Sequence, residues 1–542
     1  MERISTQSKD GPSREDLLDQ RTVDATAKST HRIISRNVRE YQFIVPYKER
    51  VEVGEIFSVH DIRGDIEFLA RVLDIEHDSN YSGNWDTALR GVDFYDQEQI
   101  FNRIKAEPLG CVEAGSFKKA RTIPTKFSTV SQTTGDEFSF LRSVMGDIEV
   151  GRLRNGSRVV EDIPVALHSS AMDHHMGVFA TTGMGKSNFM KVFAASCMRL
   201  AADGRSSFGL LVVDPHGEYL KGAKGGQSKG LVHLKSYASG LACFSTDREN
   251  RSMPQVEELS IAAGEIDPGD ISVLYDWSSA QRDALEAIDR VFDSSSWLDE
   301  IQSPAGIARM VEEGFGENTI NVISRRIKTL LGRNSYIQKR SSIPNIIRNL
   351  KEGKVVLVDI PRMSDRSELF LLSIISRRIM DEYKRELASG EERKSCLITI
   401  EEAQRVLGGG SGSISRFETI AREGRKFGVG LCAITQQPKL IDKQLLSQFN
   451  TLVILGLSDR NDRSRLEESA KQDLSSMDIE IQTLEKGEAI ISTLNIPFPV
   501  PARIHRFEDY VKTLSAEVGG GDLLRGRGAD LRKGGGFRPT LD

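Results

Sequence analysis

HMGVFATTGMGKSNFMKVFAASCMRL, residues 175–200, has three features in the order that a nucleotide site requires. A short apolar run indicates a buried strand, a glycine-containing turn follows, and the rest of the segment is typical of a helix. The turn ATTGMGKS (180–187) matches the phosphate-binding loop of nucleoside triphosphatases, except that Ala180 replaces the usual first glycine. A chance glycine-rich turn is the alternative interpretation. The strand before it and the helix after it favour the phosphate-binding loop.

The chemistry expected of this loop follows from its backbone. Gly183 and Gly185 permit the backbone angles that turn successive N–H groups toward phosphate oxygens. Lys186 is expected to neutralise the β- and γ-phosphates and Ser187 to ligate Mg²⁺, while the positive end of the following helix faces the same anion. We assign nucleotide binding to Thr181, Thr182, Gly183, Met184, Gly185, Lys186, Ser187 and Asn188.

A second apolar strand ends in two carboxylates. In SCLITIEEAQ (395–404), Glu401 and Glu402 emerge where the strand ends. We predict that Glu401 holds the hydrated Mg²⁺ and that Glu402 polarises the attacking water, because phosphoryl transfer depends mainly on positioned charge. An acidic pair that caps a helix is the alternative. The phosphate-binding loop upstream makes the catalytic role the favoured one.

Two further aspartates end apolar strands. Asp214, in LLVVDPHGEYL (210–220), is a second candidate for the Mg²⁺ side of the site or for sensing the γ-phosphate. Asp359, at the end of KVVLVDI (354–360), is expected to be structural.

A basic segment follows in IAREGRKFGVGLCAITQQP (420–438). Arg422 and Arg425 share a helix face, so either arginine could stabilise the charge that develops on a neighbouring subunit's γ-phosphate. A solvated basic helix end is the alternative. The next strand terminates at Gln436, whose amide is a candidate sensor of the γ-phosphate.

The order of apolar runs predicts an α/β protein. Continuous apolar strands alternating with helices indicate a parallel sheet covered on both faces, as in a RecA-like core. Short alternating strands upstream predict a small β-barrel, with a disordered leader carrying isolated hairpins as the alternative. The expected segments are a flexible tail (1–32), the β-barrel (33–150), the first part of the ATPase core (151–259), an inserted helical subdomain (260–350), the second part of the core (351–510) and a Gly/Arg-rich tail without a rigid fold (511–542).

Composition narrows the class of protein. The formal net charge is −5, so any nucleic-acid contact is expected to be local and not spread over the whole surface. The five cysteines are scattered singly, which argues against a disulfide framework and a zinc site. There is no apolar run of about 18 residues and no secretion signal, so we expect a cytoplasmic protein.

The phosphate-binding loop, DPHGEY, ITIEEAQ, REGRKFGVGL and ITQQP occur in this order, and with them the chain resembles the HerA family of hexameric DNA translocases. The resemblance runs from about Ile33 to Phe507. It implies that Lys186 and Ser187 bind nucleotide, that Glu402 is the catalytic carboxylate, that Arg425 or Arg422 acts in trans, and that Gln436 is the sensor. Two features depart from the family pattern: Ala180, and Glu-Glu-Ala-Gln at 401–404 where many relatives have Asp-Glu-Ala-His.

The resemblance also implies a setting. We expect a homohexamer that uses ATP and Mg²⁺ to move double-stranded DNA through its channel, with a NurA-like nuclease or a defence effector (sirtuin-like or nuclease) docked on the barrel. The alternatives are a nucleotide-regulated scaffold that licenses an effector and a conjugation- or secretion-type ATPase. Contacts to DNA phosphates are predicted, with a solvated surface loop as the alternative for each, at Lys221, Lys224, Lys229 and Arg416.

Overall fold

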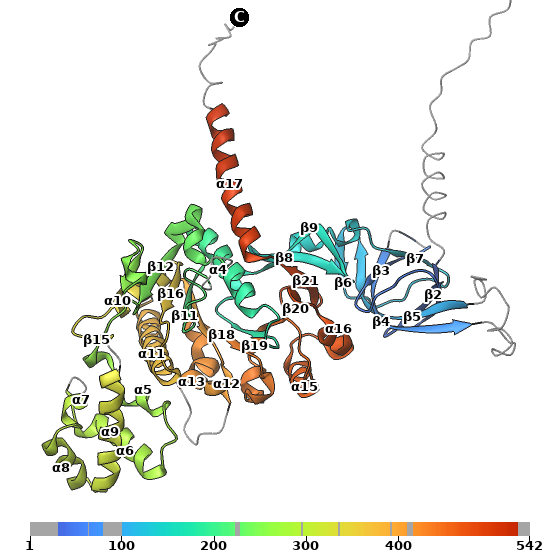
Figure 1. The fold of residues 1–542 in the computed structure, drawn as a ribbon. Helices are drawn as coiled ribbons and strands as arrows, with labels where there is room; N and C mark the ends of the chain where they lie inside the picture. Colours follow the sequence, from blue (N-terminus) through green and yellow to red (C-terminus); the bar gives the residue numbers. More distant parts are fainter. Residues whose placement is uncertain are drawn as a thin grey trace, which may run out of the picture. The chain divides into compact units, whose positions relative to one another are not determined.

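The computed structural model describes residues 31–62, 64, 66–79, 100–222, 228–293, 296–333, 336–390, 393–408 and 416–528 (Figure 1). Contacts divide the chain into two compact units. Unit 1 comprises the residues up to 144 together with 153–163 and 475–480, and unit 2 comprises the remainder.

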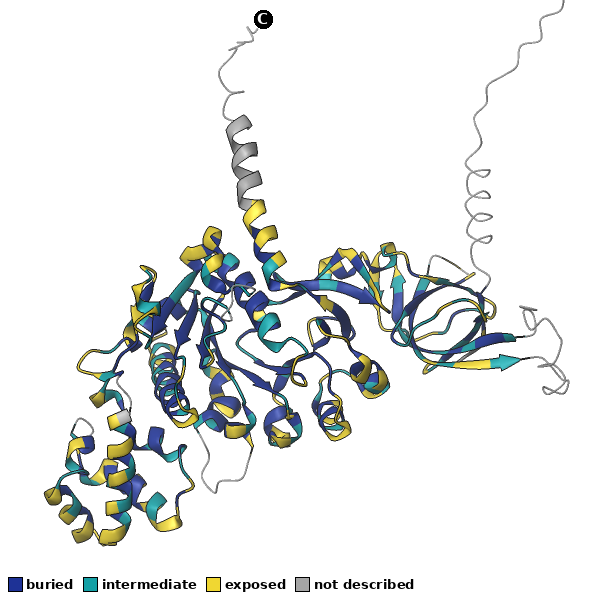
Figure 2. Cartoon of the chain, viewed as in Figure 1, coloured by how far each residue is buried: buried dark blue, intermediate teal, exposed yellow. Residues whose placement is uncertain are grey.

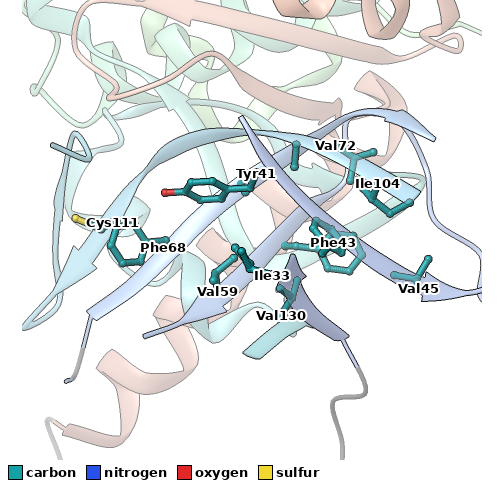
Figure 3. Packing of buried hydrophobic residues seen from close by; sticks show 13 residues of the cluster. Ile33, Tyr41, Phe43, Val45, Val59, Phe68, Val72, Ile104, Cys111 and Val130 are labelled. Atoms are coloured by element: carbon teal, nitrogen blue, oxygen red, sulfur yellow. The ribbon is translucent and has the colours of Figure 1, made fainter. Parts of the chain in front are cut away.

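Unit 1 contains a closed six-stranded barrel. The strands follow the order β2-β1-β7-β3-β4-β5, and antiparallel pairing of β5 with β2 closes the ring. Inward-facing residues of β2 alternate with partly exposed ones, as in a strand with one buried face. Figure 3 shows the resulting core, in which Tyr41, Phe43 and Phe68 are fully buried. The strands are β1 (His31–Arg36), β2 (Tyr41–Pro46), β3 (Ile56–His60), β4 (Ile66–Ser79), β5 (Ile100–Glu113) and β7 (Thr129–Gln132), with β6 (Ser116–Lys118) beside β5.

A segment from late in the chain completes unit 1. Residues 475–480 contribute Glu480, which forms a buried ion pair of 2.6 Å with Arg154. Ser476 donates a hydrogen bond of 2.6 Å to Glu107. A side chain at Gly54 would lie 2.5 Å from the Glu480 carboxyl carbon, so the buried carboxylate requires glycine there. Removing one member of such a buried pair is strongly destabilising.

Unit 2 is built on a twelve-stranded sheet in the order β13-β12-β16-β11-β17-β18-β10-β19-β20-β21-β8-β9, of which residues 153–163 in β8 and β9 are counted with unit 1. The ladder from β13 to β19 is parallel, and β20 and β21 continue it antiparallel. The central strands are buried along their whole length (Figure 2), as expected for a sheet covered on both faces. The bounds are β13 (Val256–Glu258), β12 (Leu241–Ser245), β16 (Val355–Asp359), β11 (Phe208–Asp214), β17 (Ser395–Ile400), β18 (Val429–Thr435), β10 (His175–Phe179), β19 (Phe449–Ile454), β20 (Glu488–Thr493), β21 (Val500–Ile504), β8 (Ile148–Asn155) and β9 (Arg158–Leu167).

Helices interrupt the α/β alternation between β14 (Ile261–Ala262) and β15 (Ile337–Gln338), which pair in parallel. The first helix begins sharply because Asp267 caps it and Pro268 occupies its first turn. The buried carboxylate of Asp270 binds Arg377 of α11 (Asp365–Ser389), which attaches the insert to the core. The insert contains α5 (Pro268–Ser272), α6 (Ser279–Val291), α7 (Trp297–Glu300), α8 (Pro304–Glu312) and α9 (Glu317–Arg333).

The predicted fold class is confirmed: a β-barrel, a parallel α/β core and an inserted helical subdomain. Helix α17 (Phe507–Gly528) continues into the segment for which we expected no rigid fold. The rest of that segment, residues 529–542, and residues 1–30 lie outside the described part of the chain. All five cysteines are buried and free of disulfides. No helix among the described residues is long and apolar enough to cross a membrane.

Candidate nucleotide site

The phosphate-binding loop lies at the carboxyl end of β10 and leads into α4 (Lys186–Ala202). Two neighbouring segments hold it. The amide of Thr181 donates to the Gly456 carbonyl, after β19, at 2.9 Å, and the amide of Gly487, before β20, donates to the Met184 carbonyl at 3.3 Å. The loop is therefore fixed to the sheet on the side away from its phosphate-facing amides.

The two loop glycines adopt backbone angles that other residues rarely take. Gly183 has φ 87° and Gly185, the N-cap of α4, has φ 110°. Ala180 is fully buried and is absent from the described residues with positive φ. Alanine at position 180 therefore causes no left-handed backbone strain, which explains why the first glycine of the motif is dispensable here.

Lys186 lies between the loop backbone and the two acidic residues. Its Nζ donates to the Ala180 carbonyl at 3.2 Å. Burial lowers the pKa of Lys186, while the carboxylates of Glu402 and Glu401 act in the opposite direction. The structure thus brings together the lysine and both carboxylates that the sequence analysis assigned to one site.

Glu401 follows β17 and is held by a tyrosine. The hydroxyl of Tyr219 donates to Glu401 Oε1 at 2.9 Å. Burial raises the pKa of Glu401 to about 7, against the lowering effects of the Tyr219 hydrogen bond and the charges of His216 and Lys186. Carboxylate oxygens are the ligands that Mg²⁺ prefers, so the predicted role of Glu401 as a metal ligand stays a prediction.

Glu402 belongs to a chain of side-chain hydrogen bonds along the carboxyl ends of β17 and β18. Gln404 Nε2 donates to Glu402 Oε2 at 2.7 Å, and Gln436 Nε2 approaches Glu402 Oε1 at 3.4 Å. The hydroxyl of Thr182 donates to Gln436, and that of Thr435 donates to Gln404. This chain connects the phosphate-binding loop to the predicted catalytic carboxylate through the predicted sensor.

Glu402 also has a strained backbone. Its φ is 47°, in the left-handed region that residues other than glycine rarely adopt. The turn is held by the amide of Ala403, which donates to the Ile434 carbonyl at 3.0 Å. Such a conformation costs about 1–2 kcal/mol, and it is typical of residues that are fixed for function.

The family profile and several sequence relatives of this chain carry the same family name. The family profile described as "Helicase HerA, central domain" matches residues 148–379. The DNA double-strand break repair helicase HerA of Saccharolobus solfataricus is 27% identical over 369 residues, which cover 66% of this chain and 69% of that protein. The HerA of Pyrococcus furiosus is 23% identical over 555 residues, covering 89% and 93%. Among solved structures, the bacterial conjugative coupling protein TrwB has a TM-score of 0.44 at 13% identity, covering 69% of this chain and 92% of that one.

The chain is an ATPase whose residues 148–379 match the HerA family. The predicted family and class of enzyme are confirmed.

In the part of the chain that matches HerA, the carboxylate of Asp214 is hydrogen-bonded by its own turn. Its oxygens accept backbone hydrogen bonds of 2.8 Å from both Gly217 and Tyr219, and of 3.2 Å from both His216 and Glu218. Burial raises its pKa, and these backbone donors oppose the shift. We therefore assign Asp214 a positioning role, because its turn presents Tyr219 to the Glu401 side of the site. The direct Mg²⁺ contact predicted for Asp214 stays a prediction.

Asn188 has structural contacts. Its amide donates to the His505 carbonyl at 2.8 Å and accepts from the Phe507 amide at 3.0 Å, which joins the first turn of α4 to the start of α17. Its predicted contact with nucleotide stays a prediction, as does that of Ser187 with Mg²⁺.

The predicted arginines lie away from the phosphate-binding loop of the same chain. Arg422 is in α13 (Arg416–Glu423) and Arg425 in the following turn, just before the amino end of β18. The loop follows the carboxyl end of the adjacent parallel strand β10. Neither arginine can therefore act on the nucleotide of its own subunit in this arrangement.

The predicted DNA contacts have different surroundings. Lys221 Nζ is 3.8 Å from a Glu249 carboxylate oxygen. Arg416 forms ion pairs with Asp267 and with the buried Asp270, so its charge is balanced within the chain. The Lys229 carbonyl accepts a hydrogen bond from Lys191 at 3.2 Å. Lys224 lies outside the described residues.

Some site residues escaped the sequence analysis. Tyr219 is part of the quoted DPHGEY motif, and its fixed distance from Asp214 was an available signal. Gln404 lies two positions after Glu402, so its amide could have been considered as a hydrogen-bond partner of the Glu402 carboxylate. Neither had been given a role.

Proposed function

We propose that this chain works as a homohexameric ring that couples hydrolysis of ATP, with Mg²⁺, to translocation of double-stranded DNA. The observation that carries the proposal is the continuous arrangement of Thr182, Gln436 and Glu402 beside Lys186. A motor must link the state of its phosphates to its catalytic base, and this chain of hydrogen bonds provides that link. The relatives named as DNA double-strand break repair helicases support DNA as the cargo.

Each residue has a defined task in this proposal. The phosphate-facing backbone amides within 182–187 and the Lys186 ammonium bind the triphosphate, and Ser187 and Glu401 offer a hydroxyl and a carboxylate oxygen to Mg²⁺, which would neutralise phosphate charge. Glu402 orients the attacking water and accepts its proton. Gln436, bonded to both Thr182 and Glu402, changes partners when the γ-phosphate departs.

The position of the arginines supports the proposed ring. Since Arg422 and Arg425 lie at the amino ends of the strands, we propose that Arg425, with Arg422 beside it, reaches the nucleotide of a neighbouring subunit. An arginine supplied in trans contributes about 10³-fold or more to the rate of phosphoryl transfer.

DNA contacts are proposed to be phosphate-directed and independent of sequence. Lys221 and Lys229 remain the candidates among the described residues, whereas the balanced charge of Arg416 favours a structural role. A NurA-like nuclease or a defence effector is the proposed partner of the barrel. Co-purification of the chain with its natural complement of proteins, followed by mass spectrometry, tests this part separately.

ATP hydrolysis measured with and without blunt duplex DNA tests the motor. We expect duplex DNA to raise the rate several-fold, and Lys186→Ala and Glu402→Gln to abolish hydrolysis, with Glu402→Gln still binding ATP. Lys443→Ala, which removes an exposed lysine paired with Glu468, is the matched control. If duplex DNA leaves the wild-type rate of hydrolysis unchanged while single-stranded DNA or protein raises it, the cargo is not double-stranded DNA.

A further inference from the structure

A cavity of about 450 Å³ lies where β10, β18 and β19 begin, at the edge of the sheet opposite the phosphate-binding loop. Its lining combines four separate parts of the chain: the start of β10, the end of α13 and its turn, the start of β19, and the segment after α15 (Arg460–Ser469). The side chains that matter for its charge are Arg422, Arg425, Lys426, Lys471, Gln448 and Asn450.

The four cations of this cavity share one feature, which is that their charges are not balanced by an acidic side chain among the described residues. Within the described residues, none of them forms an ion pair or a side-chain hydrogen bond, and all four are exposed. Cations that flank residues 422–426 in the sequence are paired: Arg416 with Asp267, and Lys439 with Asp459 at 2.9 Å. Like charges around one concavity repel each other, and a multiply charged anion would relieve that repulsion.

The cavity is also rigidly framed. His175 forms part of the lining, and its Nδ1 accepts a hydrogen bond of 3.0 Å from the Leu431 amide while the ring bonds the backbone of Ala421, just before Arg422. On the opposite side Gln472, next to Lys471, bonds Ile496, Ser492 and Thr493 at 2.7–3.2 Å. The backbones that carry the cations are therefore held in place, so a ligand need not order them.

The nucleotide of the same chain cannot fill this cavity. Strand β10 runs from His175 at the cavity to Phe179 before the phosphate-binding loop. Five residues at about 3.3 Å each separate the two sites by roughly 16 Å. A phosphate in the cavity must belong to another molecule.

We propose that the cavity receives the terminal phosphates of the ATP bound by a second copy of this chain, and that Lys471 is a ligand there beside the arginines. The proposal rests on the ring described above and adds Lys471, from a different element, to its composite site. A compact polyanion matches four cations around one concavity. A duplex presents its charges in a row, about 3.4 Å apart along the axis for each strand, which calls for a stripe of cations instead.

Complementation between variants tests the proposal. ATP hydrolysis without DNA is measured for Lys471→Gln, for the charge-retaining Lys471→Arg and for Lys443→Gln, the exposed lysine of α14 (Lys443–Leu446) outside the cavity. We expect Lys471→Gln to lower the maximal rate at least tenfold, Lys471→Arg to retain most of it and Lys443→Gln to match the wild type. Mixing Lys471→Gln with Lys186→Ala subunits should restore hydrolysis, because an intact cavity then faces an intact phosphate-binding loop.

Each other outcome overturns the proposal in a recognisable way. Lys471→Gln could hydrolyse ATP at the wild-type rate without DNA but bind duplex DNA more weakly and with a smaller dependence on salt. That result would mean that the cavity binds DNA phosphates. A lowered rate without recovery at any mixing ratio, in assemblies of normal mass by light scattering, would place Lys471 in a role within its own subunit. A wild-type chain that hydrolyses ATP as a monomer would overturn the ring as well, which separates failure of the proposed function from failure of this inference.

Discussion

The hydroxyl of Tyr219 donates a hydrogen bond of 2.9 Å to Oε1 of Glu401, across 182 positions of the sequence. The tyrosine is placed by the turn that Asp214 caps, so this aspartate acts on Glu401 through one buried ring as well as through its own charge. The relationship orients the oxygen that we assign to Mg²⁺.

Tyr219→Phe is expected to weaken the use of Mg²⁺. Burial already raises the pKa of Glu401 to about 7, and loss of the hydroxyl removes a contact that lowers it. A larger fraction of Glu401 is then protonated at pH 7, and a protonated carboxyl is a poor ligand for Mg²⁺. We expect the Mg²⁺ concentration for half-maximal hydrolysis to rise about three- to tenfold at pH 7 and the difference to shrink near pH 9. Tyr237→Phe, in another buried tyrosine, is the control.

Substitution of Glu402 is expected to separate stability from activity. Because φ is 47° at this position, Glu402→Gly should raise the free energy of unfolding by about 1 kcal/mol relative to Glu402→Gln, which keeps the strained backbone. Both variants should lack hydrolysis. Urea denaturation of the two proteins measures the difference, and equal stabilities would show that the turn stores no strain.

His175 is expected to make stability depend on pH. Burial lowers its pKa to about 4, below the ordinary value of 6.5. A depressed histidine pKa means that the folded state binds fewer protons, so its stabilising contribution is complete above pH 6.5 and is lost as the pH falls toward 4. Over that window the wild type should lose up to about 3 kcal/mol more than His175→Gln in chemical denaturation. His233→Gln, at an exposed position, should follow the wild type.

Arg416→Met is expected to destabilise the protein without affecting DNA binding. Its guanidinium joins α13 to Asp267 and to the fully buried Asp270, which keeps Arg377 as a second partner. The cost should be on the order of 1 kcal/mol, because the pair is partly solvated and Asp270 stays compensated. Thermal unfolding and the salt dependence of duplex binding are measured together, with Arg248→Met as an exposed control. If the affinity of Arg416→Met for duplex DNA depends less on salt than that of the wild type, Arg416 contacts DNA phosphates after all.

The sequence was sufficient where the chemistry is local. The phosphate-binding loop occupies eight consecutive positions, and Glu401 and Glu402 directly follow an apolar strand, so spacing alone predicted their proximity at one sheet edge. The glycines were assigned by the same reasoning, and the structure adds that position 180 never needed one because its backbone is not left-handed.

Contacts between distant segments could not be predicted. Thr182 and Gln436 are 254 positions apart, and the parallel pairing of β10 with β18 is what brings them together. Lys471 lies in a polar segment with no motif, and only the fold shows that it shares a cavity with Arg425. Arg416 shows the same limit: a basic residue beside a glycine run predicted a DNA contact, and only the fold shows that two aspartates of the insert balance its charge.

Strand β10 is five residues long, buried throughout and hydrogen-bonded to a parallel neighbour on each side. Such a strand is rigid, because a close-packed interior has low compressibility and transmits a displacement from one end to the other. A shift of the phosphate-binding loop at one end must therefore appear at His175 at the other. In the proposed ring, nucleotide binding to one subunit's phosphate-binding loop would then displace the cavity of the same subunit, which faces the nucleotide of its neighbour. Subunits coupled in this way would hydrolyse ATP in succession instead of independently.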